Sequence, residues 1–86
     1  MTAQQLERDL APLRAYVCHT LLNGRSVTDG EELLLSGLLD SLSVMSLVSF
    51  VEKNYDLQVP FEDVVIEHFE SISAIGSYLN RRTQDA

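Results

Sequence analysis

Apolar residues recur every three or four positions along three stretches of this chain, the spacing that places side chains on one face of a helix. The stretches are Leu10, Leu13, Val17 and Leu21; then Leu42, Met45, Val48, Val51 and Tyr55; then Ile72, Ile75 and Leu79. No strand pattern competes, because Val64, Val65 and Ile66 form a run that is short and unpartnered. The sequence therefore predicts an all-α fold, and 86 residues suffice for one domain.

The first helix is bounded by a capping residue and by a left-handed stop. Asp9 suits the N-cap position, and Pro12 is tolerated in the first turn, whose N–H groups lack helical partners. Asn23 and Gly24 favour the left-handed conformation that ends helices. We predict this helix over about residues 10–22, with residues 1–8 forming a frayed additional turn.

A long connection and a well-signalled second helix follow. Residues 23–40 begin polar and end rich in leucine, so we expect their end to lie across the core. The leucines are Leu33, Leu34, Leu35, Leu38 and Leu39. Gly37 permits a turn that is closed to other residues. Asp40 is a good N-cap for the second helix, which we expect to end at about residues 54–56.

The last third of the chain predicts one short helix and one longer helix. Pro60 forces an extended turn, and residues 61–69 form a short helix or turn. Ser71 caps the last helix, in which Gly76 indicates a close approach of another helix. Residues 83–86 are expected to be a tail. The whole chain is then one domain, a small four-helix bundle of three main helices plus one short helix.

The chain is acidic, with thirteen Asp and Glu against six Lys and Arg and a formal net charge of −7. Nucleic acids and anionic membranes both attract basic surfaces, so we expect neither as a partner. An acidic small protein is instead steered toward basic patches on other proteins. Neither a membrane span nor a signal peptide is evident, and we expect a cytoplasmic monomer.

Cysteine and histidine residues do not assemble into a recognisable enzyme site. Cys18 is the single cysteine, so an internal disulfide is impossible. His19 is its neighbour in sequence and points elsewhere on a helix. His68 has no companion ligands, although a metal site needs three or four. We therefore predict no catalytic residue and no metal site.

The residues that stand out chemically are Asp40, Ser41 and Leu42, at the head of the second helix. With Asp40 as N-cap, Ser41 is the first helical residue, at the positive helix end that favours a phosphate ester. Because Asp40 supplies the cap, esterifying Ser41 need not unfold the helix start. We expect Leu42 to turn inward and to anchor the serine on a rigid element. Taken alone, three such residues indicate only a helix N-terminus.

The sequence around this motif makes it more specific. Ser-Gly-Leu-Leu-Asp-Ser-Leu at 36–42 is followed by an apolar helix and by Val59 and Pro60. Glu-His-Phe-Glu-Ser-Ile-Ser-Ala-Ile follows at 67–75. Over about 60 residues, this combination resembles the acyl carrier protein family, which includes peptidyl carrier domains.

The resemblance implies a carrier rather than an enzyme. In that family a phosphopantetheinyl transferase moves 4'-phosphopantetheine from coenzyme A onto the motif serine, which Ser41 matches. The thiol of the arm then carries an acyl or aminoacyl thioester between enzymes, so Cys18 is not needed as the cargo thiol. The expected partners are the transferase, an acyl- or aminoacyl-adenylating ligase and downstream biosynthetic enzymes. We expect a free-standing carrier whose arm is attached to Ser41.

The family's second helix is also its main docking surface, and many fatty-acid carriers have acidic residues along it. Here the exposed candidates are mostly serine and apolar residues. We expect partners to dock on Val44, Met45, Ser46 and Val48. Such a face resembles that of a dedicated carrier in a specialised pathway, such as nonribosomal peptide or polyketide biosynthesis.

Two alternatives remain open at this point. A carrier-like bundle that never receives the arm would act as a structural or interaction subunit, although such a protein has no need of an exposed Ser41. A small enzyme lacks support, because the sequence shows no metal cluster, no phosphate-binding glycine loop and no plausible triad.

Overall fold

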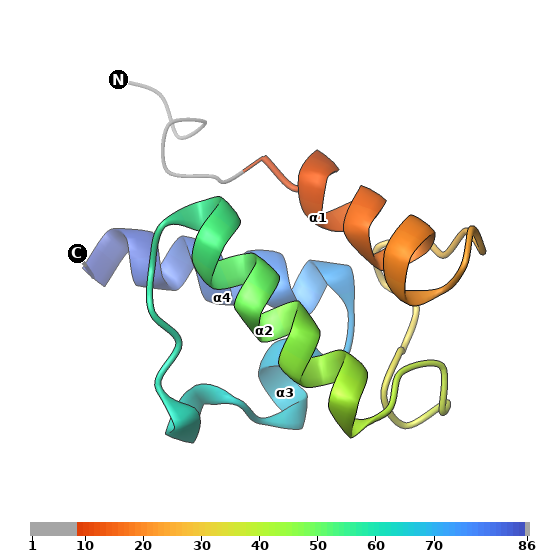
Figure 1. Cartoon of the computed structure of the whole chain (residues 1–86). Helices are drawn as coiled ribbons and strands as arrows, with labels where there is room; N and C mark the ends of the chain where they lie inside the picture. Colours follow the sequence, from red (N-terminus) through yellow and green to blue (C-terminus); the bar gives the residue numbers. More distant parts are fainter. Residues whose placement is uncertain (1–8, 86) are drawn as a thin grey trace.

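The helices of the chain pack as one layered bundle in the computed structural model, which describes residues 9–85. They are α1 (Ala11–Ala15), its π-helical continuation η2 (Tyr16–Leu21), α2 (Ser41–Tyr55), the 3₁₀-helix η3 (Phe61–Asp63), α3 (Ile66–Phe69) and α4 (Ile72–Asp85). The described residues contain no strand. Figure 1 shows α2 crossing in front of α4, with α1 above it and the short α3 below. The predicted all-α architecture of three main helices and one short helix is confirmed.

The start of the first helix differs by one residue from the prediction. Leu10 rather than Asp9 occupies the N-cap position, and the helix begins at Ala11. The Asp9 carboxylate still accepts a hydrogen bond from the Ala11 backbone N–H, at 3.0 Å. Pro12 lies in the first turn as expected. Residues 1–8, expected as a frayed turn, lie outside the described part of the chain.

The second half of the first helix is wound as a π-helix, which the sequence did not predict. The Leu22 N–H donates to the Val17 carbonyl at 2.9 Å, a bond that spans five residues instead of four. The predicted stop is confirmed, because Asn23 and Gly24 both have positive φ, at 55° and 91°. Within this segment Val17 is fully buried and Cys18 is partly buried.

The long connection between the first two helices lies across the core, as predicted. Leu33 and Leu39 are buried, whereas Leu35 is exposed, contrary to our expectation for the leucine-rich end as a whole. Two backbone hydrogen bonds join this connection to the end of α3 and the start of α4: Leu33 N–H donates to the Glu70 carbonyl at 2.7 Å, and Ser73 N–H donates to the Asp29 carbonyl at 2.8 Å. The connection is therefore a structured part of the bundle.

The last helix begins where Ser71 predicts, since the Ala74 N–H donates to the Ser71 hydroxyl at 3.0 Å. The close approach expected at Gly76 is real. A β-carbon placed there would lie 2.8 Å from the Leu10 Cδ1 atom, so the neighbour is the side chain just before α1. The helix continues to Asp85, so residues 83–85 belong to it and do not form the expected tail.

The segment between α2 and α4 is held by a small polar cluster. The Tyr78 hydroxyl donates to Asp63 Oδ2 at 2.7 Å, and Arg82 Nη1 donates to the Tyr78 hydroxyl at 2.6 Å. His68 stacks on Tyr78 with ring centroids 4.7 Å apart, and its Nδ1 lies 2.8 Å from the Asp63 carbonyl oxygen. These contacts give His68 a structural role that fixes η3 and α3 against α4.

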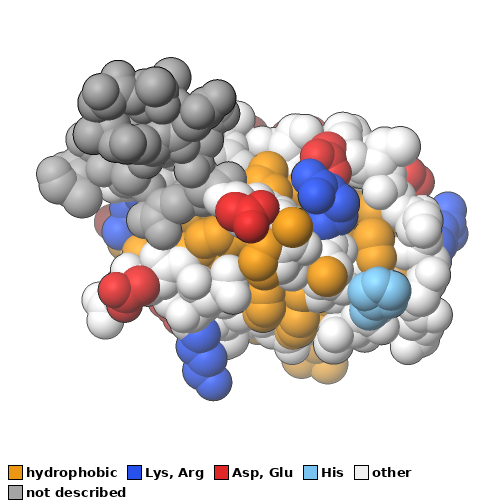
Figure 2. Space-filling view, turned by 90° about the horizontal axis from the view of Figure 1, so that it is seen from above, with side chains coloured by type: hydrophobic (Ala, Val, Ile, Leu, Met, Phe, Trp, Pro, Cys, Tyr) orange, Lys and Arg blue, Asp and Glu red, His pale blue; other side chains and the backbone are white. Residues whose placement is uncertain are grey.

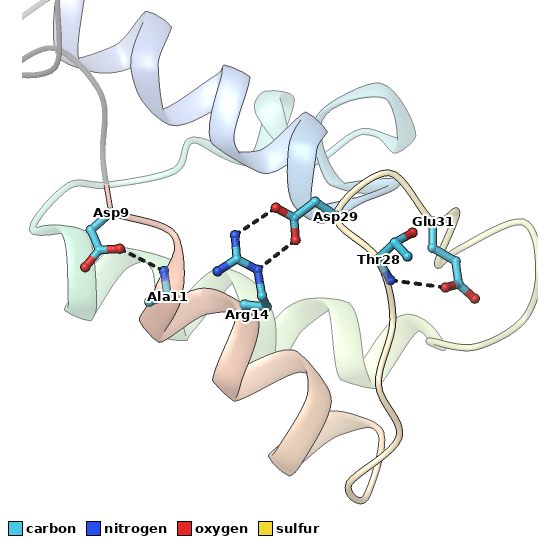
Figure 3. A network of polar contacts seen from close by, with 6 residues as sticks. All are labelled: Asp9, Ala11, Arg14, Thr28, Asp29 and Glu31. Carbon is cyan, nitrogen blue, oxygen red and sulfur yellow. Dashed lines mark hydrogen bonds and ion pairs between the residues drawn. The ribbon is translucent and has the colours of Figure 1, made fainter.

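An ion pair joins α1 to the long connection (Figure 3). Arg14 Nε and Nη2 donate to the two carboxylate oxygens of Asp29, both at 2.7 Å. The guanidinium hydrogen bond lowers the pKa of Asp29 below its ordinary value of 3.8. Both side chains are partly exposed, so solvent screening limits the contribution of the pair to about 0.5–1 kcal/mol.

Asp29→Asn should therefore lower the free energy of unfolding by about 0.5–1 kcal/mol at pH 7. Because the folded-state pKa of Asp29 is lowered, its contribution is present above the unfolded value of 3.8 and is lost as pH falls through the folded value. Urea denaturation of wild type and variant at several pH values measures the difference, which should shrink toward zero in acid. A difference that is unchanged at low pH would contradict this assignment.

Neither negative nor positive charge dominates the face of the protein seen in Figure 2. Acidic and basic side chains both occur there, and apolar side chains run between them. Among the described residues, no helix combines the length and the apolar character needed to cross a membrane.

Candidate functional site

The start of α2 is capped as the sequence predicts. Asp40 has an extended backbone, with φ −103° and ψ −176°, and its Oδ1 accepts from the Ser43 N–H at 2.8 Å. The backbone N–H and then the hydroxyl of Ser43 lower the pKa of Asp40, which is thus ionised at neutral pH. The Asp40 carbonyl accepts the first helical hydrogen bond from Val44, at 3.0 Å. The Asp40 side chain therefore forms the helix cap, and the hydroxyl of its neighbour Ser41 is not needed for capping.

Ser41 is the first residue of α2, and its side chain is exposed. Its hydroxyl hydrogen-bonds to none of the residues that the structure describes. It lies at the N-terminus of a helix of 15 residues, where backbone N–H groups and the helix dipole favour a bound negative charge. A group attached to this oxygen would break no structural hydrogen bond among the described residues.

An apolar groove of about 490 Å³ opens beside Ser41. Its walls come from three parts of the chain: the leucine-rich connection, the first turns of α2, and residues 64–69. Leu34, Val44, Met45, Val65, Ile66 and Phe69 supply its apolar lining. Val65 and Ile66 are partly exposed, which shows that the run of three aliphatic residues at 64–66 does not simply fill the core. The serine therefore stands at the edge of an apolar surface.

Two of the residues singled out by the sequence do not lie where we predicted. Leu42 was expected to turn inward, but the residue is 79% exposed. Val48 was expected on the docking face, but it is 6% exposed and packs in the core. Met45 is 50% exposed and Ser46 is exposed, so both remain available to a partner, whereas Val44 is only partly accessible.

The reason for both errors is the presence of two apolar stripes on one helix. Leu42 lies nine residues before the fully buried Val51, which is about two and a half turns and places it on the opposite side of α2. The core stripe runs through Leu47, Val48, Val51 and Tyr55. The exposed stripe contains Leu42 and Met45. Because Leu42, Met45 and Val48 are three residues apart, the exposed stripe and the core stripe appear as one continuous stripe in the sequence.

The groove wall formed by Val65 and Ile66 was missed by the sequence analysis. A signal was present, because three consecutive apolar residues at 64–66 cannot all face the core from a short segment; only Ile66 belongs to α3. Cys18 and His19 lie on η2, outside the residues that line the groove. Across residues 9–85, no three His, Cys, Asp or Glu side chains are placed to hold a metal ion.

The structure has an exposed serine at the capped start of α2, with an apolar groove beside it. An exposed serine at the start of this helix is what the resemblance to carrier proteins predicts. The sequence pattern described as a phosphopantetheine attachment site matches residues 11–79, which include both α2 and the groove. The chain belongs to this family, the acyl and peptidyl carrier proteins. Members are modified with 4'-phosphopantetheine by phosphopantetheinyl transferases and interact with biosynthetic enzymes.

Among the solved structures similar to this chain is one described as a crystal structure of a FAD-dependent dehydrogenase. The identity is 28%, the TM-score is 0.70, and the alignment covers 77% of this chain and 96% of the matched chain. No curated protein matches this chain closely enough to count as a relative.

The residues at the start of α2 fit the family's cofactor. The Ser41 hydroxyl is exposed and free of structural bonds within the described residues, so it can become an ester oxygen. The helix N-terminus favours a phosphate, and the groove offers apolar surface beside Ser41. The arm itself supplies the reactive thiol, and the protein supplies its position.

Proposed function

We propose that Ser41 carries the phosphopantetheine arm and that the chain holds an acyl or aminoacyl thioester on its thiol. The observation that carries the proposal is the exposed Ser41 hydroxyl on the first residue of a helix already capped by Asp40. In the modification, Ser41 Oγ loses its proton and bonds to the phosphorus of the phosphopantetheine half of coenzyme A. The bond to the adenosine bisphosphate half breaks, and that half leaves.

Cargo loading tests the carrier function directly. An adenylating ligase converts a carboxylic acid and ATP to an acyl adenylate and pyrophosphate, and the arm's thiol then displaces AMP to form a thioester. We expect the modified protein, incubated with stand-alone ligases, ATP and a panel of acids and amino acids, to gain cargo mass that hydroxylamine removes. A mass gain that resists hydroxylamine, or cargo on the unmodified chain, would contradict thioester carriage.

Partner docking is proposed on the exposed apolar stripe of α2 together with the groove wall. This docking face consists of Leu42, Met45, Val65 and Ile66, all exposed and apolar. It adjoins the exposed acids Asp40 and Glu67. A partner with an apolar contact bordered by Lys or Arg would match it in both hydrophobicity and charge. This surface keeps Met45 from the sequence prediction and replaces Val48 with residues that solvent can reach.

We expect Leu42→Ala and Met45→Ala each to lower kcat/KM for modification by a phosphopantetheinyl transferase about five- to tenfold. The matched control is Phe61→Ala, because Phe61 is 85% exposed but lies outside the groove lining. The control should be modified at the wild-type rate. An equal loss of kcat/KM in Phe61→Ala, or no loss in the Leu42 and Met45 variants, would show that partners do not dock on this face.

The similarity to a structure of a FAD-dependent dehydrogenase suggests a class of downstream partner. The matched chain is about as small as this one, because the alignment covers 96% of it. The described part of this chain has no parallel sheet of the kind that holds dinucleotides. We therefore assign flavin chemistry to a partner, which would take a proton and a hydride from adjacent carbons of the tethered acyl group and reduce its flavin. Loss of two hydrogens from loaded cargo, with flavin bleaching, would support this step, and unchanged cargo mass would oppose it.

A further inference from the structure

The carboxylate of Glu32 accepts hydrogen bonds from three successive backbone amides in the connection that leads to Ser41. Oε2 accepts from the N–H groups of Leu34 at 3.0 Å and Leu35 at 2.6 Å. Oε1 accepts from the N–H of Ser36 at 2.6 Å. Both carboxylate oxygens are thus bonded to the backbone of residues 34–36, although no pattern in the sequence singles out Glu32.

A second layer of contacts closes the same turn. The Ser36 hydroxyl donates to the Glu32 carbonyl at 2.8 Å. The Gly37 N–H donates to the Leu34 carbonyl at 3.1 Å, and Gly37 adopts a positive φ of 84° that favours glycine. Residues 32–37 therefore form a defined turn instead of a loose loop, and we call this segment the Glu32 turn.

The Glu32 turn is joined to the Ser41 site by short links. The Leu39 N–H donates to the Leu33 carbonyl at 2.9 Å, and both of these leucines are buried. Leu39 precedes Ser41 by two residues, and Leu34, whose N–H is bound by Glu32, lines the groove with Ser41. A change in the shape of the turn would therefore move one wall of the groove and the chain entering α2.

The electrostatics favour an ionised Glu32. Desolvation opposes ionisation, but the hydrogen bonds from Leu35, Ser36 and Leu34 outweigh it and lower the pKa below its ordinary value of 4.5. Charge-assisted hydrogen bonds of this kind are shorter and stronger than neutral ones. The neighbouring Glu31 differs, since within residues 9–85 its carboxylate accepts one backbone bond, from Thr28 at 3.3 Å, and lies 4.0 Å from Arg25.

We propose that Glu32 is a positioning residue that holds the turn beside Ser41 in the shape a phosphopantetheinyl transferase recognises. The proposal rests on the proposed attachment at Ser41. Glu32 does not touch the reacting atoms and acts through the backbone of residues 34–36. If only a fraction of molecules holds the turn, the apparent affinity for the transferase falls by that fraction, while turnover of the bound complex is unchanged.

The test compares Glu32→Ala, Glu32→Gln and the matched control Glu31→Ala, which removes an adjacent charge. With a broad-specificity transferase and coenzyme A, Glu32→Ala should raise KM for the carrier about tenfold and leave kcat within about twofold. Glu32→Gln keeps one carbonyl oxygen for the amides of Leu34 and Leu35 and should recover part of the loss. Glu31→Ala should behave as wild type. Circular dichroism confirms that each variant is folded at the assay temperature.

A second readout does not depend on modification. In the unmodified wild type, the amide resonances of Leu35 and Ser36 should shift together as Glu32 titrates below pH 4.5, and this shift should vanish in Glu32→Gln. The proposal would be overturned if Glu32→Ala and Glu31→Ala had equal KM values. It would also be overturned if the amide resonances of Leu35 and Ser36 did not shift as Glu32 is protonated. If the wild-type protein is not modified but these amide resonances shift as described, the proposed attachment at Ser41 is wrong. Glu32 then holds the turn but has no role in recognition by a transferase.

Discussion

Ser41→Ala should abolish attachment of phosphopantetheine while leaving the helical content of the protein unchanged. The variant removes the only oxygen that we assign to the arm. Helicity should persist because Asp40 caps α2 through Ser43. Peptide mapping by mass spectrometry, after incubation with coenzyme A and a transferase, measures both the presence and the position of the arm.

The matched control for this prediction is Ser43→Ala. Ser43 lies in the same helical turn, and the substitution retains its backbone N–H, which donates the capping hydrogen bond to Asp40 Oδ1. We expect its modification to equal that of wild type. Modification of Ser41→Ala at another serine would move the site, and a large loss of helical signal in Ser41→Ala would show that this hydroxyl has a capping role after all.

Leu47→Ala should destabilise the protein by about 2–5 kcal/mol, because it leaves a cavity in the core. Leu47 is fully buried, and small domains are stable by only about 5–15 kcal/mol. Leu42→Ala makes the same chemical change on the same helix, but at a residue with most of its side chain in water. It should change the free energy of unfolding by less than about 0.5 kcal/mol.

Urea denaturation of both variants beside wild type measures this contrast. The two substitutions share helix, residue type and change in helix propensity, so the difference between them reports burial alone. A loss of several kcal/mol in Leu42→Ala would restore the inward position that the sequence suggested, and it would remove Leu42 from the docking face.

Three of the helix boundaries could be predicted because they depend on local chemistry. Asp40, Ser71 and the pair Asn23 and Gly24 each act through bonds or dihedral angles within a few residues of themselves. The all-α architecture follows from the spacing of apolar residues, which is a property of each segment. The position of Ser41 at the head of α2 needed no tertiary information, since the cap alone sets it.

The remaining features depend on contacts between distant segments, which spacing cannot specify. Leu42 and Val48 fit one apolar stripe in sequence, but packing of the core selects the stripe that holds Leu47 and Val51. The groove wall at residues 64–66 exists because the Asp63, Tyr78 and Arg82 cluster fixes the preceding segment against α4. The bonds of Glu32 to residues 34–36 appear only when the turn is folded.

The most direct test of the carrier assignment is the intact mass of the wild-type protein before and after incubation with coenzyme A and an active phosphopantetheinyl transferase. We expect a gain of one phosphopantetheine per chain, with no second addition on longer incubation. No gain, under conditions in which the transferase modifies a known carrier, would contradict the account and would favour an unmodified bundle that acts by binding other proteins.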